Sequence, residues 1–245
     1  MHFIVTRPEA DAEALQAPLE AMGHRVSLAP MLTISFPGTA PLDVTGCAAL
    51  IATSRNGLRA LEIQRDSLSP EVWQIPLFAV GPGSAALARS MGFAEVVEGP
   101  ANAAALVPLL AVRFAGQASV FTHLSGDAQA FDLKAALVPL GFELRQLVLY
   151  RSNPATVLPG DILTGLAQNS FDAVILMSPQ TAQTFVKVVA QAGLTDGARK
   201  LDFLCLSSAV ESQLMAWQPV RAAIAAKPNL EEILVLASQA TKQFR

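Results

Sequence analysis

The stretch LIATSRNGLRAL (Leu50–Leu61) decides the fold, because its pattern is repeated later in the chain by VILMSPQTAQTF (Val174–Phe185). In each stretch an apolar run ends in small hydroxyl residues and passes directly into a helical pattern. The following segments correspond as well, FAVGPGSAALARSMG (Phe78–Gly92) to FLCLSSAVESQLMAW (Phe203–Trp217). Repetition in the same order predicts a duplicated α/β unit, and such a unit generally binds its ligand between the copies.

An earlier part of each copy is also repeated. A shift of 118 positions places Arg7–Val26 over Ser125–Leu144, with Gly23 over Gly141. Short apolar runs alternate with helical patterns along the whole chain, which predicts parallel sheets connected by helices. We expect strands at HFIV, RVSLA, AALIA, LFAV, EVVE, SVFTH, LRQLVLY, AVILM, FLCL and VRAAI.

Two longer extended runs, PMLTISFPG (Pro30–Gly38) and RQLVLYRSNPA (Arg145–Ala155), indicate a pair of linkers. Two linkers in a duplicated chain imply that the first domain is discontinuous, with each copy lending its first strand-helix-strand piece to the other copy's sheet. The expected domains are 1–33 plus 155–245 and 40–146, with linkers at 34–39 and 147–154. Two sequential domains divided near Gly116 are the alternative.

Composition limits the class of protein. The 245 residues are 52% apolar and 15% charged, enough for two domains with cores, yet no run of eighteen residues lacks charges and breakers, so we expect no membrane span. The amino terminus does not resemble a signal peptide, and Cys47 and Cys205 have no CxxC partner, which predicts a cytoplasmic protein. A net charge of −3 with dispersed basic residues argues against nucleic acid. We expect a monomer.

Several turns between strand and helix are candidate anion sites. In open α/β sheets these turns lie at the carboxyl ends of the strands, where free helix N–H groups attract anions. The alternative is that each hydroxyl only caps its helix. The candidate residues are Thr53, Ser54, Arg55, Gly81, Gly83, Ser84, Ser125, Gly126, Ser178, Pro179, Ser207 and Ser208.

Other motifs are weaker. Gly81, Gly83 and Ala86 approximate GxGxxA, but Pro82 removes a backbone donor from that loop, so a dinucleotide site is a distant second reading. The three histidines lie far apart, and GxSxG, P-loop and HExxH motifs are absent from the sequence. We therefore expect no metal and no organic cofactor. Tyr150, the sole tyrosine, is a candidate proton donor in the second linker.

The chain resembles the uroporphyrinogen-III synthase family over nearly its whole length. The resemblance rests on VTRPEA (Val5–Ala10), PMLTI (Pro30–Ile34), IATSRNG (Ile51–Gly57), FAVGPGSAAL (Phe78–Leu87), LVLYRS (Leu147–Ser152) and ILMSPQTA (Ile175–Ala182). It implies two similar flavodoxin-like α/β domains joined by a two-stranded linker. It also implies cyclisation of hydroxymethylbilane, a linear tetrapyrrole with eight carboxylates, to uroporphyrinogen III, with inversion of ring D and loss of water.

The family resemblance assigns roles to particular residues. Thr53, Ser54, Ser84 and Ser178 fall on positions that line the interdomain cleft in the family, and Tyr150 falls on the family's linker tyrosine. The chain departs from the family pattern at Ser207–Val210, where relatives usually carry Gly-Pro or Ser-Pro followed by a threonine. The rival function is a non-catalytic two-domain protein that closes on a small anion.

Overall fold

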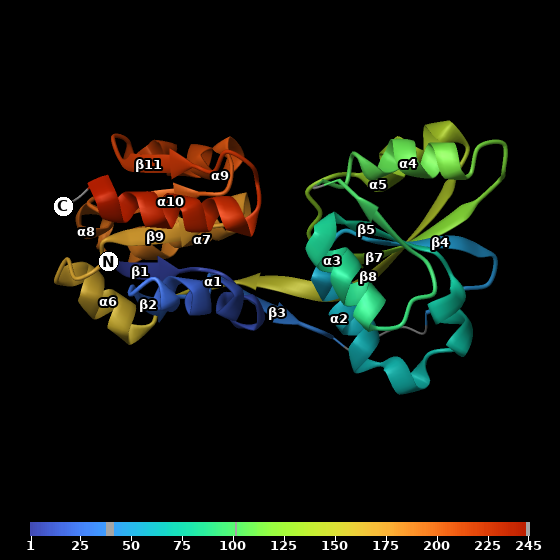
Figure 1. Ribbon diagram of the computed structural model, residues 1–245, viewed down its shortest axis with the longest axis horizontal. Helices are drawn as coiled ribbons and strands as arrows, with labels where there is room; N and C mark the ends of the chain where they lie inside the picture. Colours follow the sequence, from blue (N-terminus) through green and yellow to red (C-terminus); the bar gives the residue numbers. More distant parts are fainter. Residues whose placement is uncertain (38–41, 101, 244–245) are drawn as a thin grey trace. The chain divides into compact units, whose positions relative to one another are not determined.

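The computed structural model describes residues 1–37, 42–100 and 102–243. The chain forms two compact units, one of Met1–Thr33 with Asn153–Arg245 and the other of Ile34–Ser152. In each unit helices cover a sheet (Figure 1). The predicted end of the first linker, at 39, and the predicted start of the second domain, at 40, lie outside the described residues.

The first unit contains a five-stranded sheet in the order β11-β10-β9-β1-β2, and every pairing in it is parallel. Its strands are β1 (His2–Val5), β2 (Arg25–Leu28), β9 (Ala173–Leu176), β10 (Asp202–Cys205) and β11 (Arg221–Ile224). Its helices are α1 (Glu9–Ala21), α6 (Gly160–Ala167), α7 (Pro179–Gln191), α8 (Thr195–Ala198), α9 (Ser208–Glu211), the 3-10 helix η4 (Ser212–Trp217) and α10 (Leu230–Gln243).

Alternation along the strands gives the first unit two cores. Phe3, Val5 and Ile175 pack with apolar residues of α1 and α10 on one face of the sheet. Ile4 and Val174, their neighbours in the chain, pack on the other face with residues of α6, α7 and η4. Both faces are covered, which explains why these strands are continuous apolar runs.

The second unit contains a six-stranded sheet in the order β3-β8-β7-β4-β5-β6, with parallel pairing from β8 through β6. Its strands are β3 (Leu32–Ser35), β4 (Cys47–Ala52), β5 (Leu77–Val80), β6 (Val96–Gly99), β7 (Val120–Gly126) and β8 (Glu143–Pro154). Its helices are α2 (Arg55–Ile63), η1 (Arg65–Ser67), η2 (Pro70–Gln74), α3 (Gly81–Ser90), α4 (Leu106–Arg113), α5 (Leu133–Leu137) and η3 (Val138–Leu140).

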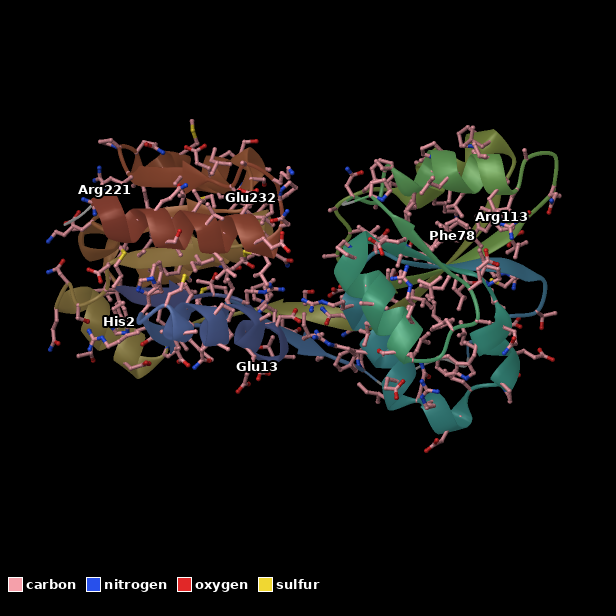
Figure 2. All side chains as sticks on the ribbon, in the orientation of Figure 1. His2, Glu13, Phe78, Arg113, Arg221 and Glu232 are labelled. Carbon is pink, nitrogen blue, oxygen red and sulfur yellow. The ribbon has the colours of Figure 1, made fainter. Side chains whose placement is uncertain are left out.

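Two cores fill the second unit in the same way. Leu50 and Leu77 pack with α2 and α3, whereas Ile51 and Phe78 pack with α4 and α5. Phe78 is labelled among the interior side chains of this unit in Figure 2, and the centroid of its ring lies 6.1 Å from the ring centroid of Phe114. The parallel α/β fold class and every predicted strand are confirmed. Among the described residues no helix is long and apolar enough to cross a membrane.

Strand β8 extends the second sheet further than the sequence suggests. It pairs with β7 from Val120↔Glu143 to Gly126↔Tyr150. Leu147, Val148 and Tyr150 are therefore sheet residues, as the predicted strand LRQLVLY requires, and they also fall within the range 147–154 predicted as linker. Strand β3, from the other predicted linker, lies beside β8 at the edge of the same sheet.

Gly57 allows α2 to lie close to β7. A Cβ atom added at this position would overlap the backbone carbonyl oxygen of Leu124, which the sheet holds in place. The close approach fixes the start of α2, and with it Ser54 and Arg55, against the end of β7.

We expect Gly57→Ala to destabilise the protein by about 1–3 kcal/mol, the usual cost of overpacking. Gly160→Ala, at the exposed start of α6, is the matched control because a Cβ there meets nothing within 4 Å. The control should be neutral or stabilising by about 0.5 kcal/mol. Urea unfolding measures the free energy of unfolding of both variants. A Gly57→Ala variant as stable as Gly160→Ala would contradict the close packing of Gly57 against β7.

Candidate functional site

The carboxyl ends of β4 and β5 carry two of the predicted turns, and the parallel pairing of these strands makes the turns neighbours. Ser54 caps α2, its side-chain oxygen accepting a hydrogen bond from the N–H of Asn56 at 3.2 Å. Helix α3 begins at Gly81, directly after β5. Both helices direct free N–H groups and the positive ends of their dipoles at this edge of the sheet, which suits an anion.

The residues of these two turns contact each other. A Cβ atom added at Gly83 would lie 3.8 Å from the Cδ of Arg55, so the arginine side chain passes over the first turn of α3. Gly81 has a φ of 72°, which favours glycine. Ser84 is buried in the first turn of α3 rather than presented on a loop.

Ser125 and Gly126 belong to strand β7 and not to the turn that the sequence suggests. The hydroxyl of Ser125 is buried and donates to the carbonyl oxygen of Leu147 at 3.3 Å. This bond ties β7 to β8. Ser125 therefore has a structural partner, while Gly126 faces Tyr150 across the two strands.

Tyr150 is a residue of strand β8 and lies opposite Gly126 of β7. Its side chain is only 7% exposed and packs with the core beneath α2 and α3. The ring lies against Gly126, where an added Cβ would be 2.5 Å from Cε2 and 2.9 Å from the phenol oxygen. Only glycine leaves room for the ring.

The phenol of Tyr150 stays protonated at neutral pH. Burial raises its pKa above the ordinary value of 10.0, and the nearby Asp127 acts in the same direction. A hydrogen bond with the side chain of Ser54 acts in the opposite direction without cancelling the effect of burial. Ser54, from a distant part of the sequence, thus influences the pKa of the Tyr150 phenol.

His123 is a neighbour of the site that the sequence analysis did not select. Its Nε2 atom lies 3.0 Å from the Oγ1 atom of Thr53. The contact follows from the register of β7 with β4, in which His123 stands opposite Ile51, two residues before Thr53. His123 lies two residues before the candidate residue Ser125, but the sequence does not show its contact with Thr53.

The first unit has a corresponding edge at the ends of β9 and β10. Ser178 caps α7 by accepting from the N–H of Thr181 at 3.1 Å, and its hydroxyl also contacts the Thr181 hydroxyl at 2.8 Å. Pro179 occupies the first turn of α7. Ser207 precedes the short helix α9 without a side-chain capping bond, and Ser208 begins that helix, exposed.

The structure therefore brings the predicted residues together as two sets, one in each unit. A cavity of about 320 Å³ lies elsewhere, where Asp202, Arg221 and Leu236 are among its lining residues. Asp202 and Arg221, the latter labelled in Figure 2, begin β10 and β11, at the opposite end of the sheet from Ser178 and Ser207, and Leu236 belongs to α10. Among the described residues no group of His, Cys, Asp and Glu side chains is arranged to hold a metal ion.

Comparison with known proteins decides the family. Residues 13–234 match the family described as uroporphyrinogen-III synthase HemD. The chain belongs to the uroporphyrinogen-III synthase family. This membership confirms the family resemblance and places the chain among the enzymes of tetrapyrrole synthesis.

Two solved structures share the fold. The uroporphyrinogen-III synthetase of Helicobacter pylori is 18% identical and aligns with a TM-score of 0.67 over 97% of this chain and 98% of its own. A mutant uroporphyrinogen III synthase of Thermus thermophilus is 17% identical, with a TM-score of 0.64 over 99% of both chains. The likeness extends over the full length of each.

The sole tyrosine makes the environment of Tyr150 measurable. In a spectrophotometric titration of the folded protein, we expect the phenol to ionise above pH 10, because burial disfavours the phenolate. Gly126→Ala should lower this pKa towards 10, since the added methyl group displaces the ring. Gly83→Ala, where the nearest contact is an ordinary 3.8 Å, is the control and should leave it unchanged. A wild-type phenol that titrates at its ordinary value would show that the ring is not buried here.

Proposed function

We propose that this protein is a uroporphyrinogen-III synthase that cyclises hydroxymethylbilane to uroporphyrinogen III, with inversion of ring D and loss of water. Family membership across residues 13–234 supports the reaction most strongly. We further propose that the two units are its domains and that the enzyme acts as a cytoplasmic monomer without a metal or organic cofactor.

The carboxyl edges of the two sheets supply what this substrate requires. Hydroxymethylbilane carries eight carboxylates. In the proposed site these carboxylates bind to the helix N-termini of α2, α3 and α7 and to the hydroxyl groups beside them. Backbone N–H groups neutralise the substrate without many basic side chains, which suits a chain with a net charge of −3. Arg55, beside Gly83, adds one guanidinium to this edge.

The chemistry starts with loss of the ring A hydroxyl group as water. The protonated phenol of Tyr150 donates a proton to the departing hydroxyl, and the electron pair of the breaking C–O bond leaves with the water, which forms the azafulvene in its N-protonated, cationic form. The methylene carbon of this cation then bonds to the substituted carbon of ring D. The bond from that carbon to the methylene bridge of ring C breaks, the released methylene bonds to the unsubstituted carbon on the other side of the ring D nitrogen, and the proton on that carbon is lost, which balances the proton that Tyr150 donated. Ser54, hydrogen bonded to Tyr150, orients the phenol.

The protein also contributes to the reaction by controlling the conformation of the substrate. A free azafulvene closes directly to the unrearranged type I isomer, so the enzyme has to hold the tetrapyrrole curled for attack at the substituted carbon. Binding several carboxylates at once supplies that orientation, and orientation alone accounts for large rate effects.

Product analysis tests the function. The full-length protein, dialysed exhaustively against a chelator, is incubated with freshly made hydroxymethylbilane, and the oxidised porphyrin isomers are separated. We expect type III to exceed its level in a protein-free control. Type I alone would overturn the proposed function, and tight binding without turnover would favour the anion-binding protein.

We expect Tyr150→Phe to slow turnover by about 10²- to 10⁴-fold, the range typical of general acid catalysis, with KM nearly unchanged. The phenylalanine ring fills the same space against Gly126, so the fold should persist. Circular dichroism checks the fold, and Tyr150→Ala serves as a comparison that loses packing as well. A phenylalanine variant with the wild-type rate and isomer ratio would remove Tyr150 from the mechanism.

A further inference from the structure

His123 is a buried polar side chain for which the proposed mechanism has no use. It is 1% exposed and projects from β7 within the second unit. Its Nε2 atom contacts the Thr53 hydroxyl at 3.0 Å. Its other ring nitrogen, Nδ1, has no hydrogen-bond partner within the part of the chain that the structure describes.

The imidazole of His123 is neutral at physiological pH. Burial lowers its pKa from 6.5 to about 4, because the charged form is poorly solvated inside the protein. A neutral imidazole carries one hydrogen, on either Nδ1 or Nε2. The two arrangements give the Thr53 hydroxyl opposite roles.

If the hydrogen is on Nδ1, Nε2 accepts the Thr53 hydroxyl hydrogen, and a buried N–H is left without an acceptor. If the hydrogen is on Nε2, it is donated to Oγ1, and only a lone pair on Nδ1 is left without a partner. Orphaned buried N–H groups are rarer than under-satisfied acceptors. The second arrangement is therefore favoured, and it leaves the hydroxyl hydrogen of Thr53 available.

We propose that His123 is a positioning residue: its Nε2–H donates to Thr53, which leaves the hydroxyl hydrogen of Thr53 directed towards a substrate carboxylate. The proposal rests on the proposed function, in which Thr53 borders an anion site. Thr53 is only partly buried and lies beside the start of α2, so its hydrogen has access to a ligand at that edge. A fixed donor discriminates in favour of anions.

The tautomer is measured first, on the full-length wild-type protein without substrate. Nitrogen-15 NMR of the histidine rings distinguishes a protonated from an unprotonated ring nitrogen, and the signals that vanish in His123→Leu identify this residue among the three histidines. We expect hydrogen on Nε2 and an unprotonated Nδ1. Hydrogen on Nδ1 would overturn the proposal, whatever the protein catalyses.

A double-mutant cycle then tests the link to substrate. We expect Thr53→Val to raise KM about tenfold, as for the loss of one hydrogen bond to a charged group. His123→Leu should raise it about 3- to 10-fold with little effect on kcat, and the double variant should resemble Thr53→Val alone. Additive effects, or a leucine variant with the wild-type KM, would contradict the proposal.

The stability of the variants distinguishes a positioning role of His123 from a role in packing. His123→Leu removes the unpartnered Nδ1 atom, and it leaves the hydroxyl of Thr53, which is only partly buried and bonds water instead, so the variant should unfold close to wild type. Thr122→Val, which removes a buried hydroxyl from the same strand, is the control and should leave KM unchanged. His123→Gln, which retains an N–H donor, should recover part of the lost affinity and replaces the leucine variant if that one fails to fold.

The proposed function and the positioning role of His123 are contradicted by different results. A wild-type protein that forms no type III isomer would overturn the proposed function and the role of Thr53 towards the substrate. The NMR result would still decide which atom of His123 carries the hydrogen. Normal product formation with additive kinetics would retain the function and overturn the positioning role.

Discussion

The parallel pairing of β4 with β7 is the constraint on which the second unit depends. It joins strands far apart in the chain, and burial of Ile51 and Phe121 at 0% exposure offsets the entropy of bringing them together. Parallel strands end at the same edge of the sheet, so this one pairing places the start of α2 beside the end of β7. The β7–β8 pairing then adds Tyr150 to that edge.

Fold class followed from the sequence because each strand is a short apolar run bounded by turns. Runs such as AVILM are buried on both faces, a pattern that parallel sheets impose. The sequence placed Tyr150 at the end of the predicted strand LRQLVLY and within a linker, but it did not show that Gly126 lies opposite this tyrosine. The pairing of β8 with β7 includes a register irregularity between Ser125 and Gly126, which the sequence does not mark.

The sequence indicated which residues lie in the candidate site, but it did not show which of them contact one another. Hydroxyl residues between strand and helix were visible in the sequence, and Ser54 and Ser178 do cap α2 and α7. Capping and anion binding are compatible, since a hydroxyl that accepts from a helix N–H retains its own hydrogen for a ligand. The bond of His123 to Thr53 and the bond of Ser125 to Leu147 depend on strand register, so no local pattern revealed them. That the candidate residues bind substrate stays a prediction.

We propose that the carboxyl edges of the sheets, and not the cavity beside Arg221, bind the tetrapyrrole. Titration of the nitrogen-15-labelled protein with uroporphyrinogen III under reducing conditions tests it through the backbone amides. We predict shift changes at residues 54–57, 81, 83–85, 178, 180 and 181, with the amides of Asp202 and Arg221 unaffected. Changes confined to Asp202, Arg221 and Leu236 would contradict the account.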